Sequence, residues 1–462
     1  MEEILVMRTE KDSIGTRELP ADAYYGINSL RGAENFRITG QRLHPELIRS
    51  LGEIKKAAAE ANRMAGVLSP EKAEAIRTAC EEIIAGSLRE SFIVDPIEGG
   101  AGTSMNMNAN EVIANRAIEL LGGTKGDYRV VHPNDHVNLA QSTNDVIPTA
   151  IKMTAIRLCD TLLGELRRLF VSLLDKSTEF AEVIKIGRTQ MQDAVPISLG
   201  QEFFAYADAV RRSIEGIEHA KAGLTIVNLG GTAIGTGINT SEGYRKSVVP
   251  LLSKESGLSL VPADNLIDST QNADCFVAVS GALKTCAAVL SKIANDLRLM
   301  SSGPNAGFNE IILPKMQSGS SIMPGKINPV IPEVVNQAAF RVIGNDLTVT
   351  LAAEAGQLEL NAFEPIIAYC LFESLTVLAA ALETFRENCV NGIAANGSGC
   401  MERLDRSTGT VTALCPYIGY DKAAHVAKRM LNEKKSAKDI ALEEGLLSGE
   451  ELDRILDPKK LI

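Results

Sequence analysis

The sequence from Ile156 to Leu174 reads IRLCDTLLGELRRLFVSLL, and its apolar residues recur at steps of three and four. Such spacing puts them on one face of an α-helix, where they form an apolar stripe that packs on neighbouring helices. A second stripe of the same kind runs from Leu283 to Met300. Both predict long amphipathic helices. The first stripe consists of Ile156, Leu158, Leu162, Leu163, Leu166, Leu169, Phe170, Leu173 and Leu174, and the second of Leu283, Cys286, Leu290, Ile293, Leu297 and Met300.

The distribution of proline extends this pattern to the rest of the chain. Proline interrupts helices, so long segments without it leave room for them. These segments are rich in alanine and leucine, and only 4% of the chain is aromatic, which suits close helix–helix packing. We therefore expect a mainly α fold with five long helices in a bundle. The proline-free segments are 149–195, 197–249, 263–303, 333–364 and 366–415.

Changes in composition along the chain predict its domains. The first part alternates helical patterns, at 47–64 and 70–84, with joints rich in glycine, asparagine and proline. The run NGSG at 396–399 marks a break, and beyond it Ser448 and Glu451 have the spacing of a capping box that opens a short helix. We expect an N-terminal mainly helical domain (1–141), a central helix-bundle domain (142–396) and a small C-terminal helical domain (397–462).

Composition and charge narrow the functional class. Of the 462 residues 45% are hydrophobic, and 47 Lys+Arg against 58 Asp+Glu give a net charge of −11. This hydrophobic content excludes a disordered chain. A nucleic acid or an anionic membrane is a poor partner, because the net charge is negative and no basic stripe stands out. The first apolar run, Ile4 to Met7, is too short for a signal or spanning segment, so we expect a cytoplasmic protein. The eight cysteines contain no Cys-x-x-Cys pair, which argues against a zinc ribbon or a disulfide scaffold.

Three polar segments stand out because each places hydroxyl and amide side chains beside glycine or just before a helical pattern. They are GGAGTSMN (99–106), QSTND (141–145) and GSSIMPGKINP (319–329). Helix N-termini with free N–H groups bind anions, so joints of this kind that converge in space can hold a carboxylate or phosphate. The structural alternative is that Thr103, Ser142 and Ser320 are ordinary helix N-caps, and for any one segment alone this alternative is favoured.

The third segment also has the composition of a mobile loop. Pro324, Pro329 and Pro332 argue against a continuous helix, and glycines leave the loop free to move, as in lids that close over a substrate. Lys326 and Asn328 are two residues apart, so in an extended stretch both can face one anion. A fourth glycine-rich stretch, GGTAIGTG (230–237), lacks the pattern of a phosphate-binding loop and is interpreted as a bend between helices.

Taken together, the three polar segments resemble the aspartase/fumarase superfamily. GSSIMPGKINP is similar to its signature loop, and GGAGTSMNMNANEV (99–112) and QSTND are similar to its two other substrate-binding regions. The similarity runs from GTRELPADAYYG (15–26) to GLLSGEELDRIL (445–456). The resemblance implies a three-domain subunit with a central five-helix bundle, a homotetramer, and active sites that each take one motif from three subunits. It also implies cofactor-free β-elimination from a succinyl-type substrate to fumarate.

Within the superfamily the chain resembles the aspartate ammonia-lyases. The similar segments are PNDHVN (133–138), STND (142–145), VNLG (227–230) and above all VIPEVVNQ (330–337). The resemblance implies reversible deamination of L-aspartate to fumarate and ammonia through an aci-carboxylate intermediate, with no metal and no cofactor. Carried over residue by residue, it assigns Ser320 as the base, Thr103, Ser142, Thr143 and Ser321 to the β-carboxylate, Thr189, Lys326 and Asn328 to the α-carboxylate, and Asn144 to the amino group.

One position departs from the wider superfamily pattern. Many members have histidine where this chain has Gln190 after Thr189. Loss of water from malate needs an acid to protonate the leaving group, whereas the amino group of aspartate is already an ammonium at neutral pH. Gln190 can bind that ammonium through its carbonyl oxygen but cannot act as an acid. This favours ammonia loss, with a class II fumarase or another lyase of the superfamily as the alternative. A non-catalytic scaffold would not need the intact motifs.

Several charged residues keep two interpretations. Glu333, which follows the loop, either pairs with a polar group at the site or complements a helix dipole, and the second is favoured. Arg129 and His132 either form a second anion site or take part in surface salt bridges, and again the second is favoured. The other histidines show no metal-ligand spacing, and they are His44, His136, His219 and His425.

Overall fold

The computed structural model describes residues 6–460 of the chain. Ile4 and Leu5, part of the short N-terminal apolar run, lie outside the described residues. The chain divides into two compact units. Unit 1 comprises the described residues of 1–162 with 216–284 and 341–377, and unit 2 comprises those of 163–215, 285–340 and 378–462. The prediction of three domains is not tested by this division and stays a prediction.

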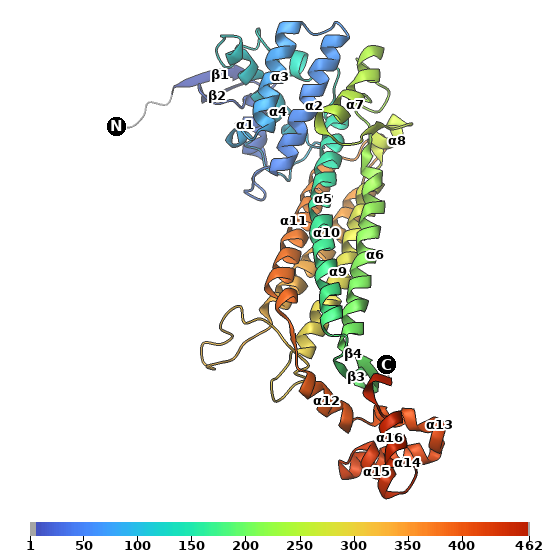
Figure 1. Cartoon of the computed structure of the whole chain (residues 1–462). Coiled ribbons are helices and arrows are strands. Elements are labelled where there is room, and N and C mark those ends of the chain that lie inside the picture. The colour runs from blue at the N-terminus through green and yellow to red at the C-terminus, as the bar shows by residue number, and fades with distance from the viewer. Residues whose placement is uncertain (1–5, 461–462) are drawn as a thin grey trace. The chain divides into compact units, whose positions relative to one another are not determined.

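Five long helices dominate the fold, as the proline-free segments predicted (Figure 1). Of the first predicted stripe, Leu162, Leu166, Leu169 and Leu173 are fully buried, so it is the packed face of its helix. Each long helix contributes residues to both units. The mainly α prediction is therefore confirmed. The helices are α5 (Thr143–Glu179), α6 (Leu199–Ala222), α9 (Asp274–Met300), α10 (Val330–Glu354) and α11 (Glu364–Asn388).

Some helix boundaries differ from what the prolines suggested. Pro332 lies in the first turn of α10, which begins at Val330, before the proline-free segment. A proline is tolerated there because first-turn N–H groups have no acceptor within the helix. In the segment 149–195 the helix ends at Glu179, and the chain then forms an antiparallel hairpin of β3 (Ile184–Thr189) and β4 (Gln192–Ser198) that the sequence patterns did not predict.

Besides its parts of the five long helices, unit 1 contains other helices and small sheets. Two helices match the predicted patterns: α2 (Pro45–Met64) and α3 (Pro70–Ile84) each begin with proline after a residue whose side chain caps the helix, His44 and Ser69 respectively. The other elements are β1 (Met7–Lys11), β2 (Thr16–Pro20), α1 (Ile27–Asn35), α4 (Thr103–Leu120), β5 (Ile226–Val227), α7 (Glu242–Ser256), β6 (Val261–Pro262) and α8 (Leu266–Gln271).

Helix α4 is buried along most of its length although it carries many amide side chains. Asn108 and Asn115 each donate to a backbone carbonyl and accept from a backbone N–H of a neighbouring segment. The Glu111 carboxylate accepts from the N–H groups of Gly26, Asn28 and Ser29 at the start of α1. These hydrogen bonds offset the cost of burying the polar side chains, and they hold the neighbouring loops against α4.

Unit 2 contains the β3–β4 hairpin, the loop before α10 and the C-terminal helices. The predicted capping box is confirmed, since Ser448 and Glu451 exchange both capping hydrogen bonds at the start of α16 (Gly449–Ile455). A small apolar core holds these helices together and includes Leu414, Val426, Ile440 and Leu452. The remaining elements are β7 (Ile311–Ile312), β8 (Ala394–Ala395), α12 (Gly397–Arg406), α13 (Cys415–Ile418), α14 (Tyr420–Glu433) and α15 (Ala437–Glu443).

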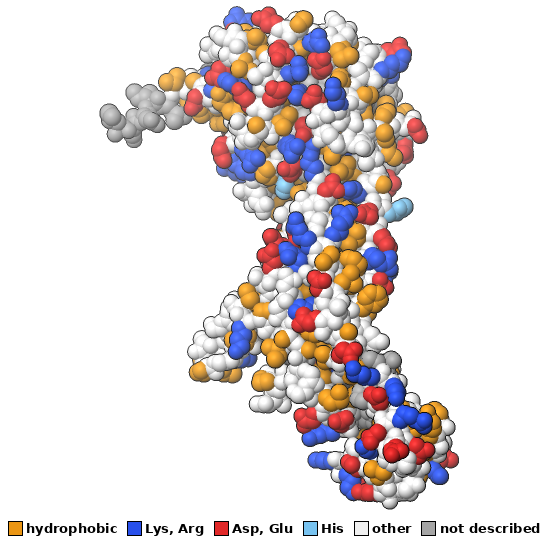
Figure 2. Space-filling model, viewed as in Figure 1, with side chains coloured by type: hydrophobic (Ala, Val, Ile, Leu, Met, Phe, Trp, Pro, Cys, Tyr) orange, Lys and Arg blue, Asp and Glu red, His pale blue; other side chains and the backbone are white. Residues whose placement is uncertain are grey.

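Surface composition and helix length bear on the expected partners. On the described surface that Figure 2 shows, lysine and arginine are interspersed with aspartate and glutamate rather than gathered in one stripe. Helix α9 and the run Glu364–Gly392 are long and apolar enough by length and composition to cross a bilayer, but 44% and 61% of their most apolar windows are buried within the protein. Core helices of a bundle meet the same criterion. All eight cysteines are free.

Candidate active site

The first polar segment, 99–106, enters helix α4 through a tight turn. Gly102 has φ +87°, and a Cβ there would lie 2.9 Å from the side chain of Ile147, so only glycine fits. Gly102, not Thr103, is the N-cap residue, which contradicts the N-cap alternative for Thr103. The Thr103 side chain is exposed, and its hydroxyl donates to Gly100 O at 2.7 Å. Thr103 therefore presents a hydroxyl at the start of a long helix.

The N–H groups of the first turn of α4 already have acceptors within the protein. This differs from the expected free N–H groups, because the Glu98 side chain folds back over the turn and accepts from two of them. Burial raises the pKa of Glu98 to about 7. No sequence motif pointed to Glu98. The acceptors are Gly100 O for Thr103, Glu98 Oε1 for Ser104 (2.9 Å) and Met105 (3.2 Å), and Gly102 O for Asn106.

The second segment, QSTND, is fixed by a buried aspartate. Asp145 Oδ1 accepts from the Ser142 N–H, and Oδ2 accepts from the N–H groups of Gly230 and Thr232 at 3.0 Å each. Burial raises the pKa of Asp145 to about 6. The Ser142 hydroxyl accepts from the Asn144 N–H at 3.3 Å, consistent with the N-cap interpretation of Ser142. Asp145 thus joins QSTND to the glycine-rich stretch 230–237, which is a loop as expected.

A buried lysine connects these two segments. Lys55 on α2 is fully buried, and its Nζ donates to Asn106 Oδ1 (2.7 Å), Asn138 Oδ1 (2.8 Å) and Gln141 Oε1 (2.9 Å). Burial lowers the pKa of Lys55 to about 7. The only sequence signal is its position four residues after Leu51, on the apolar face of the predicted helix.

Asn106 completes the connection between the two segments. Its Nδ2 donates to Asn138 Oδ1 (3.2 Å) and to Thr143 Oγ1 (3.3 Å). Asn144 is held separately, because its Nδ2 donates to Ala233 O at 2.7 Å. Unit 1 therefore brings the motif of Thr103 and the motif of Ser142, Thr143 and Asn144 into one hydrogen-bonded network.

The third segment, 319–329, is an exposed loop with its own internal hydrogen bonds. Gly319 N–H donates to Lys326 O, and Asn328 Nδ2 donates back to Gly319 O, both at 2.8 Å. The Ser320 hydroxyl accepts from two backbone N–H groups, those of Ile322 (3.2 Å) and Met323 (3.0 Å). No helix follows Ser320 in this described segment, so the N-cap alternative for Ser320 is wrong. Ser321 and Lys326 are exposed.

Thr189 and Gln190 lie at the tip of the β3–β4 hairpin. Gln190 (φ +52°) and Met191 (φ +64°) both adopt the left-handed conformation, which costs free energy for residues other than glycine and is found at functional sites. Thr189 and Gln190 are exposed. The strand below them is anchored by Lys185, which forms ion pairs with Glu202 and Glu310 at 2.9 and 2.7 Å.

The expected site residues fall in two sets that the structure describes separately. Each set belongs to one compact unit. Within unit 1, the first two motifs share one network, and within unit 2 the loop and the hairpin each have a defined local geometry. Unit 1 holds Thr103, Ser142, Thr143 and Asn144, and unit 2 holds Thr189, Gln190, Ser320, Ser321, Lys326 and Asn328.

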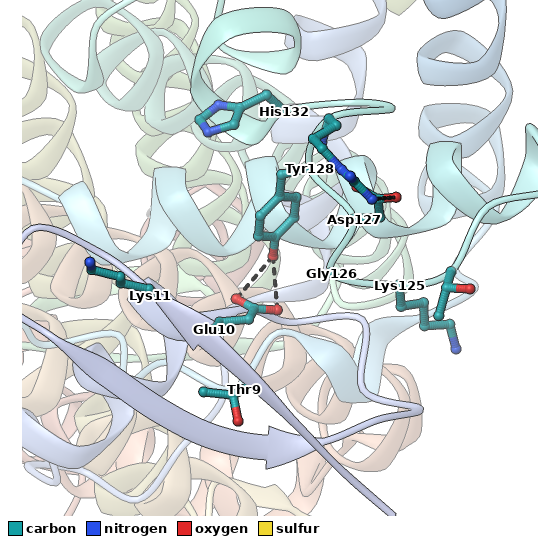
Figure 3. A pocket seen from close by; sticks show the side chains of 10 residues that line it. Thr9, Glu10, Lys11, Lys125, Gly126, Asp127, Tyr128 and His132 are labelled. Atoms are coloured by element: carbon teal, nitrogen blue, oxygen red, sulfur yellow. Dashed lines mark hydrogen bonds and ion pairs between the residues drawn. The ribbon is translucent and has the colours of Figure 1, made fainter.

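The surroundings of Arg129, His132 and Glu333 agree with the favoured interpretation of each, a salt bridge or a helix-dipole contact rather than a binding role. Arg129 is exposed and pairs with Asp127, and the His132 ring accepts from two backbone N–H groups. Both border a pocket of about 620 Å³, in which Tyr128 points toward the buried Glu10 carboxylate (Figure 3).

Glu333 lies in the first turn of α10, 3.9 Å from Arg298. Among the described residues no cluster of three His, Cys, Asp or Glu side chains could hold a metal ion.

Comparison with known proteins adds an independent observation. Residues 15–344 match a family described as "Lyase", and residues 411–462 match "Fumarase C C-terminus". An aspartate ammonia-lyase from Pseudomonas aeruginosa is 53% identical over 465 residues, covering 100% of this chain and 98% of the relative. One from Bacillus sp is 50% identical over 455 residues, covering 98% and 97%. The crystal structure of a fumarate lyase:delta crystallin from Brucella melitensis bound to cobalt is 50% identical, with a TM-score of 0.96 over 98% of this chain and 99% of that one.

Proposed function

The chain belongs to the aspartate ammonia-lyases, a family of carbon–nitrogen lyases within the aspartase/fumarase superfamily, and from this premise we propose that it deaminates L-aspartate reversibly to fumarate and ammonia. The proposal includes Ser320 as the base that removes the Cβ proton. The observation that supports it best is the pair of backbone N–H groups, from Ile322 and Met323, that donate to the Ser320 hydroxyl oxygen.

Those two donors address the main chemical difficulty of a serine base. A serine hydroxyl is a weak base unless its deprotonated form is stabilised. Two N–H groups aimed at Oγ favour the alkoxide, because hydrogen bonds to the charged form lower the pKa of a group. Lys326, on the same loop, adds a positive charge, and its influence grows when the loop closes and water is excluded.

The second requirement is to stabilise the intermediate. A C–H proton next to a carboxylate is weakly acidic. When it is removed, that carboxylate takes up a second negative charge, which has to be stabilised. We assign Thr103, Ser142, Thr143 and Ser321 as hydroxyl donors to this aci-carboxylate, each worth ~3–4 kcal/mol when well placed. Thr189, Lys326 and Asn328 hold the α-carboxylate, and Asn144 and Gln190 contact the amino group.

Gln190 favours ammonia loss over the alternative, a class II fumarase. An ammonium leaves as neutral ammonia without a further proton, whereas the hydroxyl of malate needs an acid. Gln190 has no ionisable proton, and its strained position at the hairpin tip places the amide in solvent, where a substrate can reach it. We therefore assign aspartate rather than malate as the substrate.

The catalytic assembly is proposed to be a homotetramer in the cytoplasm, with each active site built from three subunits. An exposed apolar stripe on α10 supports contact between copies: Ile343, Leu347 and Leu351 recur at steps of four and are 40%, 61% and 56% exposed. Burial of such a stripe against another subunit stabilises an oligomer. We expect neither a nucleic acid nor a membrane as partner.

Replacement of Ser320 tests the proposed base. In Ser320→Ala the loop keeps its Gly319–Lys326 hydrogen bond, so we expect an unchanged Tm and a kcat for L-aspartate lower by at least about 1,000-fold. The matched control is Ser318→Ala, an exposed serine of the same loop to which no role is assigned, which should retain activity. Near-normal turnover by Ser320→Ala would refute the assignment.

A further inference from the structure

Glu98 is a buried carboxylate with one oxygen in use and one without a partner. Oε1 accepts from the N–H groups of Ser104 and Met105, and the residue is only 7% exposed. Oε2 is buried and has no hydrogen-bond partner among the described residues. Leaving a charged oxygen buried and unpaired is costly, so the environment favours the neutral acid, which has a proton on that oxygen.

The position of Glu98 matters because of what lies beside it. Glu98 accepts a hydrogen bond from the N–H group of Ser104. Ser104 directly follows Thr103, which is assigned to the substrate's β-carboxylate. When Glu98 is ionised, its negative charge lies at the turn that the β-carboxylate of the substrate approaches. When Glu98 is protonated, it still accepts from the two N–H groups through its carbonyl oxygen, and its O–H becomes a donor.

Other charged groups surround the same turn. Asp95 lies close to Glu98, and its carboxylate is occupied by the N–H groups of Thr39, Gly40 and Ile97. Lys55 donates to the side chain of Asn106 in the first turn of α4, and it also lies near Asp145. Lys55 loses its charge near neutral pH, so it changes the charge of the site in the same direction as Glu98.

We propose that Glu98 is a positioning residue that sets the affinity for the substrate dicarboxylate through its protonation state. The protonated residue caps α4 without a charge and permits tight binding, and the ionised residue weakens binding by like-charge repulsion. This inference rests on the proposed function, because it requires that Thr103 contact the substrate's β-carboxylate.

The direction of the effect follows from the burial of Glu98. Because burial raises the pKa of Glu98 to about 7, its ionised fraction grows as the pH rises through neutrality. The Kd for a dicarboxylate should therefore increase with pH, and binding should take up protons near neutral pH. Loss of the Lys55 charge also weakens binding as the pH rises. The contribution of Glu98 is therefore obtained from the difference between the wild type and a variant that lacks this carboxylate.

The experiment compares the wild type with Glu98→Gln, which keeps the shape and the acceptor oxygen but cannot ionise. Titration calorimetry with fumarate, in the absence of ammonium so that no reaction occurs, gives Kd at about pH 6 and about pH 8.5. We expect the ratio of wild-type Kd to Glu98→Gln Kd to rise about tenfold between the two pH values. The wild type should also take up more protons on binding than the variant.

Glu119→Gln serves as the matched control, because Glu119 lies at the opposite end of the same helix and should leave the Kd ratio unchanged. A Kd ratio that is the same at both pH values, with equal proton uptake, would overturn the role of Glu98 while leaving the proposed function intact. Absence of fumarate binding by both proteins at every pH would overturn the proposed function and this inference together.

Discussion

Arg188 and Glu310 form an ion pair, with 2.7 Å between Arg188 Nη1 and Glu310 Oε1. Glu310 is fully buried and also pairs with Lys185, and the Arg188 guanidinium lies 4.1 Å above the ring of Phe308. Arg188 directly precedes Thr189, and Glu310 directly precedes β7, which leads into the loop of Ser320. The pair therefore connects the hairpin tip to the segment that leads into the Ser320 loop.

Neutralising this pair should lower both stability and substrate affinity. In Glu310→Gln the two cations Lys185 and Arg188 lose a shared counter-charge in a buried site, which costs about 3–5 kcal/mol. We expect a Tm lower by several degrees and a raised KM for L-aspartate, measured by thermal unfolding and steady-state kinetics. The control Glu215→Gln breaks the exposed pair with Arg211 and should cost at most about 1 kcal/mol. Equal Tm values for both variants would contradict the role given to Glu310.

Gly319 should be indispensable to the shape of the loop. A Cβ at this position would lie 2.5 Å from Lys326 O, so Gly319→Ala must break the hydrogen bond that closes the loop. Displacement of a catalytic group by about 1 Å costs about 100-fold in rate, and we expect a kcat loss of that size with an unchanged Tm. Gly325→Ala is the control: a Cβ there meets no atom within 4 Å, and the φ of +83° costs a residue other than glycine about 1–2 kcal/mol, so the loss in kcat should stay below about tenfold. Equal kcat values for the two variants would show that the loop closes differently.

Lys55 should make stability depend on pH. Burial lowers its pKa to about 7 in the folded protein, against an ordinary value near 10.5 in the unfolded chain. Between these values the unfolded chain binds more protons, so the free energy of unfolding increases with pH, and below about pH 7 this contribution is constant. From about pH 7 to pH 9 the wild type should gain about 2 kcal/mol more than Lys55→Met.

Urea unfolding at the two pH values measures this difference. Lys55→Met should also be less stable at both pH values, because Asn106, Asn138 and Gln141 lose their common donor. Parallel pH dependence in the wild type and the variant would mean that Lys55 stays charged in the folded protein.

Mixed oligomers can test whether active sites are shared. We expect Ser320→Ala and Thr143→Val each to be nearly inactive, because each lacks one motif in every site. If a site takes these motifs from different subunits, refolding the two variants together restores both motifs in about a quarter of the sites. Fumarate formation by the mixture should therefore exceed that of either variant alone. A mixture no more active than its components would place both motifs of a site in one chain.

The fold was predictable from the sequence wherever one physical signal dominated. The stripes of apolar residues and the proline spacing predicted the long helices, and Pro70 and Ser448 marked helix starts that the structure has. The β3–β4 hairpin was missed because its tip uses Gln190 and Met191 in a left-handed conformation that normally signals glycine or asparagine. Nothing local to the sequence announces such strain.

The candidate site was predictable from the sequence only as separate motifs, without the contacts between them. At Ser320 the motif predicts a polar, mobile loop, and only the folded backbone shows that the N–H groups of Ile322 and Met323 donate to its hydroxyl. Lys55 and Glu98 were not found, because each acts through contacts with segments distant in sequence or across a turn that only the folded backbone defines. Burial changes the pKa of both groups, and burial of a single charged residue is not readable from a periodic pattern.

Gln190 and the Ser320 loop are proposed to favour ammonia loss over dehydration. The most direct test is to follow fumarate formation with the wild-type protein and L-aspartate or L-malate in parallel reactions. We expect fumarate from L-aspartate with an equal amount of ammonia, and none from L-malate. Fumarate from L-malate alone would contradict it, because a group other than Gln190 would then have to supply the acid that dehydration requires.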